Sequence, residues 1–369
     1  MYVYLFMSQK KIKIALLGDT LANGGAERIH STLSLYFEQA GFDVHNLINL
    51  DDITYPYGGV LYNLGRFKSD DFSLLNKYKR FQLLRNYIQT NSFDYLIDFR
   101  TRSKPLTEVL LHYLLFDRGY IPTVHSSHLP WYFTTNSFWG KRIYRQAKQI
   151  ICVSQAMTDQ VKATYHYTAI QTIYNPIAIT DIQQQALDTN PIQGKRYIVA
   201  CGRMDSDLKQ YDRLIETYAQ SQLPGQGIHL IILGEGAHKK HVEQQVETLQ
   251  VKEWVSLPGF YENPFPIFKE ALFFVHSSRL EGFPTVFLEA LVCEIPVISF
   301  DCPTGPSEII QSGYNGLLIE NQNFEALQEA MEKLALDENQ RMSLKANTLA
   351  SARTFDIQAI GKQWLTLLR

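Results

Sequence analysis

The feature that most constrains the fold is an alternation of short apolar runs with helical stretches, which occurs in two series along the 369 residues. In the first series, the stretch from Ala26 to Ala40 carries apolar residues at helical spacing. The strand candidates of this series are Lys13–Gly18, Val44–Leu50, Tyr95–Phe99, Ile121–His125 and Gln149–Val153. Such alternation is typical of a parallel sheet covered by helices. Residues 1–178 are therefore predicted to form a Rossmann-like domain.

The second series begins after a loop rich in Asn, Pro and Gln, which spans residues 174–194. Its strand candidates are Tyr197–Cys201, Leu230–Leu233, Val255–Pro258, Ala271–His276, Pro296–Phe300 and Gly316–Ile319. A chain of this length is too long for one ordinary hydrophobic core. We therefore expect an α/β protein in which residues 179–354 form a second Rossmann-like domain.

The composition is that of a soluble globular protein and excludes a mainly disordered one, with 45% hydrophobic and 20% charged residues. No apolar run reaches the roughly 18 to 20 residues that a bilayer-spanning helix needs. The stretch Met1–Met7 is apolar but short and has no basic region before it, so it is not typical of a secretory signal. The sequence thus predicts a cytoplasmic protein.

The charges are divided unevenly. Residues 1–180 hold 19 Lys plus Arg against 13 Asp plus Glu, a balance of +6, and subtraction from the totals of 35 and 37 leaves 16 against 24, or −8, for the rest. Within the basic half, the segment Phe138–Lys148 is predicted to be a basic helix with aromatic residues at its start. Such a helix can lie on an anionic membrane or a lipid diphosphate, or it can be a solvated surface. Both interpretations stay open.

The cysteines do not indicate a metal or redox site. Neither a C-x-x-C pair nor His partners at ligand spacing accompany Cys152, Cys201, Cys293 or Cys302. Most of them lie in or beside apolar runs, where a cysteine usually behaves as a small buried hydrophobe.

A Gly-rich turn, Asn23-Gly24-Gly25-Ala26-Glu27-Arg28, lies between the first strand and the first helix. It is not G-x-G-x-x-G, and the second strand ends in Leu47-Ile48-Asn49-Leu50 without the acidic residue that binds a ribose in dinucleotide enzymes, so a dehydrogenase is disfavoured. Gly24 and Gly25 allow close approach of the backbone, and the helix start after them favours an anion. This turn either faces a diphosphate and an acceptor or is a plain turn.

Glu281 and Glu289 lie eight positions apart and bracket a turn and a helix start, in Arg279-Leu280-Glu281-Gly282-Phe283-Pro284-Thr285-Val286-Phe287-Leu288-Glu289. At the helical rise, eight positions separate the two backbones by roughly 12 Å. Carboxylates that share acid and base work on one glycosidic bond lie about 5 to 9.5 Å apart. These two acids therefore more plausibly contact opposite ends of one long ligand, and a nucleotide-sugar has about that length.

This segment resembles the Glu-x7-Glu signature of retaining glycosyltransferases of family 4, which have the GT-B fold and include many bacterial polysaccharide and lipid-glycan enzymes. The resemblance runs from Ile12 to about residue 356 with its landmarks in order. It implies two Rossmann-like domains that face each other across a cleft. It also implies that the C-terminal helix, residues 355–369, crosses back to pack on the first domain.

The loop Gly202–Gln210 resembles the family's G-R-(L/M)-x-x-x-K-G element, in which the Arg and the Lys contact the donor diphosphate. The resemblance assigns that role to Arg203 and Lys209, which would stabilise the negative charge of the departing nucleoside diphosphate without a metal. The sequence departs from the pattern at Gln210, where Gly is usual, and has one extra residue before Lys209, which leaves the shape of the loop open.

By the same resemblance, Glu289 accepts hydrogen bonds from the ribose, Glu281 faces the donor sugar, and His125 lies near the reacting centre. His125 titrates in a useful range and can bind a sugar hydroxyl or carry charge, and His128 is its rival. Glu281, Arg203, Lys209 and His125 are thus the predicted catalytic residues. The residues expected to bind the donor are Gly24, Gly25, Gly202, Gly259, Phe260, Gly282, Phe283, Pro284, Thr285 and Glu289.

Asp205 and Asp207 formally match the D-x-D pair of metal-dependent transferases. Because Arg203 and Lys209 would already neutralise the phosphates, we interpret these aspartates as turn and helix-cap residues. The predicted site therefore has no metal and no cofactor.

The resemblance implies a metal-independent, retaining glycosyltransferase that moves a sugar from a UDP-sugar to a glycan or a polyprenyl-diphosphate-linked glycan, with peripheral membrane contact as an option and no nucleic-acid partner. The stretch Cys302–Glu308 looks like that of enzymes that use galactose or N-acetylhexosamine donors. Two alternatives remain: a nucleotide-sugar 2-epimerase of the same fold, and a non-catalytic sugar- or lipid-binding homologue.

Overall fold

The computed structural model describes residues 11–22, 24–69, 74–115, 119–133 and 137–369. Asn23 of the Gly-rich turn and the stretch Met1–Met7 lie outside these ranges. The chain divides into two compact units. Unit 1 contains the described residues up to Val153, together with Thr158–Ile173 and Trp364–Arg369, and unit 2 contains Ser154–Met157 and Tyr174–Gln363.

Unit 1 is built on a seven-stranded parallel sheet with the strand order β3-β2-β1-β4-β5-β6-β7. Its strands are β1 (Lys13–Gly18), β2 (Asp43–Ile48), β3 (Val60–Asn63), β4 (Tyr95–Asp98), β5 (Tyr120–Val124), β6 (Ile150–Cys152) and β7 (Ile170–Thr172). Parallel strands that are buried on both faces need apolar residues throughout. β1 meets this need, because Ile14, Ala15 and Leu16 are fully buried.

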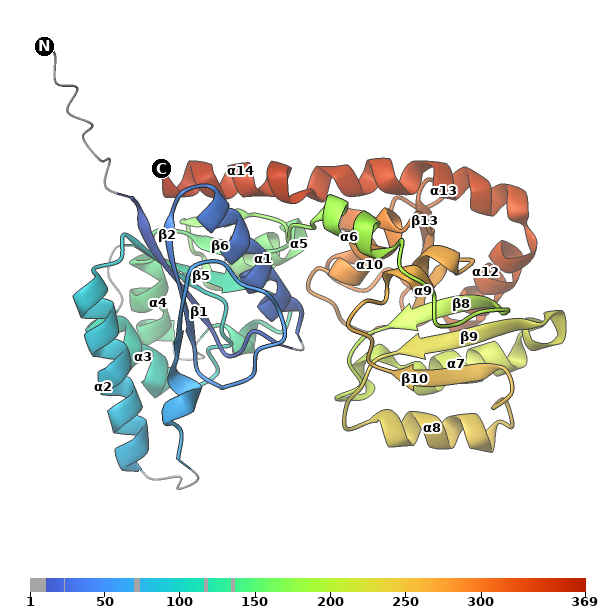
Figure 1. Cartoon of the computed structure of the whole chain (residues 1–369), viewed down its shortest axis with the longest axis horizontal. Coiled ribbons are helices and arrows are strands. Elements are labelled where there is room, and N and C mark those ends of the chain that lie inside the picture. The colour runs from blue at the N-terminus through green and yellow to red at the C-terminus, as the bar shows by residue number, and fades with distance from the viewer. Residues whose placement is uncertain (1–10, 23, 70–73, 116–118, 134–136) are drawn as a thin grey trace, which may run out of the picture. The chain divides into compact units, whose positions relative to one another are not determined.

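The helices that cover this sheet are α1 (Gly25–Gln39), α2 (Leu74–Asn91), α3 (Pro105–Leu115), α4 (Ser137–Arg145) and α5 (Gln155–Tyr165). Figure 1 shows α2, α3 and α4 together on one side of the sheet and α1 on the other. α1 buries Ile29, Leu33 and Phe37, which recur at helical spacing as the sequence pattern predicted.

Unit 2 is built on a six-stranded parallel sheet with the order β10-β9-β8-β11-β12-β13. Its strands are β8 (Arg196–Cys201), β9 (Ile228–Leu233), β10 (Val255–Gly259), β11 (Phe274–His276), β12 (Val297–Phe300) and β13 (Gly316–Ile319). The predicted α/β class with two parallel sheets is thereby confirmed. The sequence patterns found every strand of unit 2 but missed β3 and β7, the two edge strands of unit 1.

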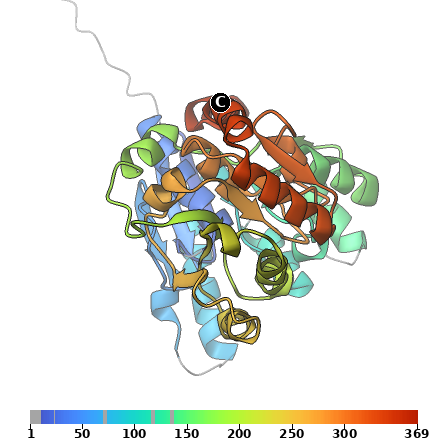
Figure 2. The same ribbon diagram turned by 90° about the vertical axis from the view of Figure 1, so that its right-hand side faces the viewer.

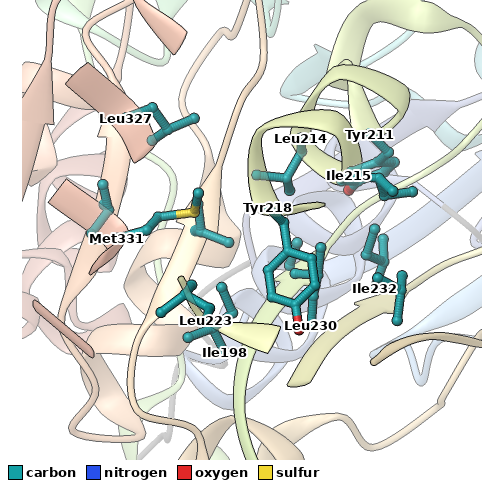
Figure 3. Packing of buried hydrophobic residues seen from close by; sticks show 14 of the residues in the cluster. Ile198, Tyr211, Leu214, Ile215, Tyr218, Leu223, Leu230, Ile232, Leu327 and Met331 are labelled. Atoms are coloured by element: carbon teal, nitrogen blue, oxygen red, sulfur yellow. The ribbon is translucent and has the colours of Figure 1, made fainter. Parts of the chain in front are cut away.

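The helices of unit 2 are α6 (Ile179–Gln185), α7 (Tyr211–Gln220), α8 (Lys239–Thr248), α9 (Phe265–Glu270), α10 (Thr285–Val292), α11 (Pro306–Ile309), α12 (Phe324–Leu336) and α13 (Glu338–Ala352). α7 and α8 lie side by side in both views (Figures 1 and 2). Figure 3 shows Leu214 and Tyr218 of α7 packed with Ile198 and Leu230 of the sheet, and Met331 of α12 closes the same core. This core holds β8 and β9 rigidly, so the loops that follow them begin from fixed points.

The final helix, α14 (Ile357–Leu368), reaches unit 1 with its last residues. There Trp364 is buried and contacts the ring of Phe37, with ring centroids 6.1 Å apart. The predicted domain boundary at residue 178 remains a prediction, while the division into units falls between Ile173 and Tyr174. None of the helices in the described residues combines the length and the apolar character that crossing a bilayer requires.

Candidate functional site

The loops that follow the strands of unit 2 meet at one edge of its sheet, because all six strands are parallel. Two of these loops touch at Gly202 and Gly234. Gly234 has φ of +140°, and a Cβ atom there would lie 2.0 Å from the carbonyl oxygen of Gly202. Only glycine fits this contact. The loops after β8 and β9 are therefore closely packed, and this edge is the candidate ligand site.

The segment that carries Lys209 is fastened to the loop after β11. This segment is a short 3-10 turn, Asp207–Lys209. The hydroxyl of Ser277 donates to the carbonyl oxygen of Lys209 at 2.7 Å, and the backbone N–H of Arg279 donates to the carbonyl oxygen of Leu208 at 3.0 Å. These bonds place the side chain of Lys209 on the same side as the loop that contains Glu281.

Lys209, Glu281 and His276 form a compact charged group. The Lys209 Nζ atom lies 2.5 Å from Glu281 Oε1, and the Nε2 atom of His276 lies 2.6 Å from the same oxygen. His276 is the last residue of β11 and is 1% exposed, and only 11% of the Glu281 side chain is exposed. Two donors thus converge on one carboxylate oxygen that is largely removed from water.

This arrangement fixes the ionisation of the group. Burial alone would raise the pKa of the Glu281 carboxyl, but Lys209 and the hydrogen bond from His276 lower it well below its usual range. The pKa of His276 is lowered by burial and by the neighbouring positive charge of Lys209. At neutral pH the group therefore consists of an ammonium, a carboxylate and a neutral imidazole.

Gln210 shows why glycine is usual at its position in the family. Its backbone has φ of 51° and ψ of 40°, which is the left-handed region that glycine adopts without cost. The side chain offsets part of this cost, because Gln210 Oε1 accepts a hydrogen bond of 2.8 Å from Gln322 Nε2. Gln210 thus holds a left-handed turn immediately before α7.

Arg203 is not part of the charged group. Its side chain is 66% exposed, and its Nε atom lies 3.6 Å from Asp205 Oδ2. Asp207 pairs with Arg279 at 2.8 Å. The helix-cap prediction for the two aspartates is wrong in detail, because the capping oxygen of the 3-10 turn belongs to Ser206. Within the described ranges, no three His, Cys, Asp or Glu side chains are grouped as metal ligands.

The turn between Glu281 and α10 is shaped by the loop after β12. The hydroxyl of Thr304 donates to the carbonyl oxygen of Glu281. Gly305 has φ of +92°, and a Cβ atom on it would lie 2.8 Å from the carbonyl oxygen of Gly282 and 2.7 Å from Pro284 Cδ. This contact positions the first turn of α10, whose positive dipole end favours an anion.

The other predicted donor residues of unit 2 lie at or near the same edge. Glu289 is buried inside α10, and Phe283 is buried against Tyr174, with ring centroids 5.2 Å apart. Gly259 ends β10, and a Cβ atom on it would lie 2.6 Å from Glu235 Oε1, while the side chain of Phe260 is 55% exposed. Their contact with a donor stays a prediction.

His125 lies in unit 1 just after β5. Its Nε2 atom is 2.9 Å from Thr123 Oγ1, and the Thr123 hydroxyl itself donates to the carbonyl oxygen of Asp98, so Nε2 carries the proton. The Nδ1 atom is buried and has no hydrogen-bond partner among the described residues. Burial and the nearby Arg102 lower the pKa of His125 to about 3. The expectation that His125 titrates near neutral pH is therefore wrong, and the ring offers an uncharged acceptor.

The helix start after the Gly-rich turn is less open to an anion than the sequence suggested. A Cβ atom on Gly24 would lie 1.8 Å from Glu27 Oε2, whereas nothing lies within 4 Å of one on Gly25. The carboxylate of Glu27 thus occupies the positive end of α1, because acidic side chains are favoured there. A donor contact at Gly24 and Gly25 remains a prediction.

Sequence reasoning missed His276 and Thr304, which contact Glu281. In the sequence, His276 ends the apolar run of β11 and looks like an ordinary strand residue. The available signal was its place at the carboxyl end of a parallel strand, five residues before Glu281. Thr304 offered none, since a hydroxyl in a Pro- and Gly-rich loop usually serves the turn itself. The cysteines behave as predicted, with Cys152, Cys293 and Cys302 buried.

Comparison with known proteins agrees with this picture. Residues 23–181 match the model of "Glycosyltransferase Family 4", and residues 181–350 match the model of "Glycosyl transferases group 1". Together the two matches extend over most of the chain. Campylobacter jejuni has two similar proteins.

The first is named N-acetylgalactosamine-N,N'-diacetylbacillosaminyl-diphospho-undecaprenol 4-alpha-N-acetylgalactosaminyltransferase, and it is 26% identical over 96% of this chain and 99% of its own length. The second is named GalNAc-alpha-(1->4)-GalNAc-alpha-(1->3)-diNAcBac-PP-undecaprenol alpha-1,4-N-acetyl-D-galactosaminyltransferase, and it is 24% identical over 97% and 98%.

Among solved structures, that of Anabaena HepE in complex with UDP-glucose aligns with a TM-score of 0.78 over 96% of this chain and 99% of that one, at 19% identity. This agreement confirms the predicted GT-B fold. Because the family models and the fold agree with the residue pattern, the chain belongs to the group 1, family 4 glycosyltransferases.

Proposed function

We propose that this glycosyltransferase is metal-independent and retaining, and that it moves a sugar from a UDP-sugar to a glycan or lipid-linked glycan acceptor in the synthesis of a surface polysaccharide or glycoconjugate. The observation that carries the proposal is the pairing of Lys209 with Glu281 beside the first turn of α10. The Lys209 cation, the Glu281 carboxylate and the positive end of α10 suit a diphosphate-linked sugar.

The chemistry follows from these groups. When the bond between sugar and phosphate breaks, negative charge accumulates on the departing diphosphate. In the proposal, Lys209 and the N-terminus of α10 stabilise that charge, and Arg203 reaches the outer phosphate from its exposed position. Glu281 faces the sugar and Glu289 the ribose. The departing phosphate accepts the proton of the acceptor hydroxyl on the face that it leaves.

The donor and acceptor classes are supported by the relatives. Both Campylobacter jejuni proteins are named as N-acetylgalactosaminyltransferases that act on undecaprenyl-diphosphate-linked glycans, and HepE was solved with UDP-glucose. We infer a UDP-linked hexose or N-acetylhexosamine donor and a polyprenyl-diphosphate-linked acceptor for this chain. Unit 1, which carries His125 with its uncharged acceptor nitrogen, is proposed to receive the acceptor.

The test is turnover of a panel of radiolabelled UDP-sugars with and without polyprenyl-diphosphate glycans. Transfer to lipid, or slow hydrolysis of one donor, supports the proposal. Conversion into the 2-epimer supports an epimerase, and binding without turnover supports a non-catalytic homologue. Lys209→Ala and Glu281→Ala are both expected to abolish transfer while circular dichroism stays unchanged, and near wild-type rates in either variant would refute its role.

We also propose that the protein works at the cytoplasmic face of a membrane, as a peripheral protein. The start of α2 supports this, because Leu74, Leu75 and Tyr78 are 81%, 80% and 62% exposed and alternate with Lys77 and Lys79. Exposed apolar residues among cations suit an anionic bilayer surface. The basic helix predicted for Phe138–Lys148 is present as α4 and is a second candidate for this contact.

Sedimentation with phosphatidylglycerol vesicles tests the membrane contact. Wild-type protein is expected to sediment with the vesicles and to be released at high salt, because charges at a surface are screened. The double substitution of Leu74→Ser and Leu75→Ser is expected to stay in the supernatant. Leu336→Ser, at an exposed apolar position in unit 2, is the control. Equal sedimentation of all three proteins rules out the α2 contact.

A further inference from the structure

We propose that His276 is a positioning residue of the transfer reaction, which holds the Glu281 carboxylate toward the donor while the diphosphate engages Lys209. The inference rests on the proposed function of Lys209 and Glu281. It assigns a task to a residue that does not itself face the ligand.

His276 is a rigid donor because the sheet and two aromatic rings fix it. It ends β11, where it pairs with Ser299 of the neighbouring strand β12. Its ring stacks on Phe274 and meets the edge of Phe287, with ring centroids 6.1 Å and 5.0 Å away. A buried ring held on two sides cannot follow a ligand, so the position of its Nε2 atom is set by the fold.

The proton of His276 lies on Nε2. Glu281 is a carboxylate and can only accept, so the 2.6 Å contact requires Nε2 to donate. The Nδ1 atom is buried and has no hydrogen-bond partner in the part of the chain that the structure describes. A neutral imidazole with its proton on Nε2 satisfies both conditions, and the low pKa of His276 keeps it in this form.

The two hydrogen-bond donors to Glu281 Oε1 differ in mobility. Lys209 reaches it with a flexible side chain that is 23% exposed, whereas His276 is buried. A diphosphate carries more charge than one carboxylate and attracts the Lys209 ammonium. Glu281 then loses part of the Lys209 contact and keeps the His276 contact. Without His276, the carboxylate would lack the buried one of these two contacts at the moment when the sugar donor arrives.

A merely structural histidine would give a different outcome. Loss of such a residue lowers stability, and restoring an N–H at its place does not restore kcat. Among the described residues, Lys209 from the 3-10 turn and His276 from β11 lower the pKa of Glu281. Tyr211 from α7 and Cys302 from the loop after β12 also face Glu281, and both are buried with raised pKa values.

The experiment compares two substitutions that separate the ring from its donor. His276→Gln keeps an N–H close to the place of Nε2 but loses the ring. His276→Phe keeps an aromatic ring and loses the hydrogen-bond donor. His229→Phe is the matched control, because His229 lies on β9 against Trp254, with ring centroids 5.0 Å apart, and the structure shows no contact to Glu281 within its described residues.

His276→Phe is expected to lower kcat by about ten- to a hundredfold, as loss of a hydrogen bond to a charged group does, with the donor KM within about twofold. His276→Gln, which keeps an N–H near Glu281, is expected to recover most of kcat. An equal kcat in His276→Phe and His276→Gln, or a wild-type kcat in both variants, overturns the proposal.

A second readout does not depend on turnover. In protein labelled with 15N-histidine, the signal that disappears in His276→Gln is assigned to His276 and is expected to show a neutral ring protonated on Nε2 at pH 6. A ring protonated on Nδ1, or a charged ring, overturns the proposal. If the wild type turns over no sugar donor, the proposed function fails. The tautomer tests separately whether His276 donates to Glu281, even where His276→Phe does not fold.

Discussion

At the scale of single residues, the proposed chemistry depends on a lysine and a glutamate that contact each other before any donor is bound. Their 2.5 Å contact makes them energetically coupled. A diphosphate would have to draw Lys209 partly away from Glu281. The pair therefore acts as one unit, and its members should not contribute independently to catalysis.

A double-mutant cycle of Lys209→Met and Glu281→Gln measures this coupling. Each single substitution is expected to lower kcat by at least about a hundredfold, as removal of one stabilising donor does. The double substitution is expected to cost far less than the product of the two losses. Lys252→Met, which breaks the exposed pair with Glu247, is the control. Multiplicative losses would show that the two residues act separately.

Buried neutral histidines make stability depend on pH. His30 and His125 lie on either side of Phe99, and burial lowers their pKa values to about 4 and about 3. The unfolded chain takes up these protons near pH 6.5, whereas the folded chain does not. Each residue thus contributes stability above pH 6.5 that is lost as the pH falls toward its folded pKa, by about 1.4 kcal/mol per pH unit.

Urea unfolding at several pH values tests this expectation. The midpoint is expected to fall steadily between pH 6.5 and 4.5, and His30→Gln, which keeps an N–H toward Asn46, is expected to reduce the slope. Glu281 should contribute little to this decline, because its contribution is lost mainly below its unfolded pKa of 4.5, which is the lower end of that window. A midpoint that is constant across the window would contradict the assigned protonation states.

Part of the candidate site was visible in the sequence, because family resemblance pointed to Lys209 and Glu281, which the fold brings together. His276 was not visible, because its role comes from a contact across a turn that only the fold creates. The charge state of His125 was also hidden, since it depends on burial and on Arg102, which lies 23 positions earlier in the chain and is buried against the carbonyl oxygen of Thr123.

At the scale of elements, the candidate site is formed by loops whose positions the strands fix. Apolar runs predicted β8, β9 and β12 because these strands are buried on both faces. β3 and β7 were missed because they are short and lie at the edges, where burial does not impose a pattern. Hydrophobic periodicity finds the strands that have a core on both sides.

Gly305→Ala tests whether the loop after β12 sets the position of α10. The new methyl group would collide with the carbonyl oxygen of Gly282, and φ of +92° is costly for alanine, so a loss of about 1 to 3 kcal/mol in the free energy of unfolding is expected. The donor KM should rise as well, because the first turn of α10 would move. Urea unfolding measures the free energy of unfolding, and initial rates measure the donor KM.

Gly225→Ala is the control for this substitution. Gly225 is exposed, has no atom within 4 Å of a Cβ and needs no left-handed backbone, so neither quantity should change. If Gly305→Ala matched this control in stability and in donor KM, the loop after β12 would not position α10.

At the scale of the whole molecule, the chain consists of two units, and the proposed function gives each of them a separate task. Unit 2 carries the charged group of Lys209, Glu281 and His276, and unit 1 carries His125 and the exposed basic face of α2. The end of the chain returns to unit 1 through Trp364. Two sheets with two separate cores were predictable from the repeated alternation, whereas the return of α14 came only from family resemblance.

Trp364→Ala is expected to destabilise unit 1 by about 3 to 5 kcal/mol, because it removes a large buried ring that packs on Phe37. Hydrogen exchange of α1 measures the effect locally, and protection there should fall. Gln363→Ala, at an exposed neighbouring position, is the control. Unchanged protection of α1 would show that the end of α14 does not stabilise unit 1.

In the proposed reaction, unit 2 holds a UDP-sugar whose diphosphate leaves from the face that the acceptor then enters. The most direct test is the anomeric configuration of the product, read by NMR from wild-type protein with a UDP-sugar and a polyprenyl-diphosphate-linked acceptor. The expected product is a new glycosidic bond with the same anomeric configuration as the donor. A product of inverted configuration would contradict it.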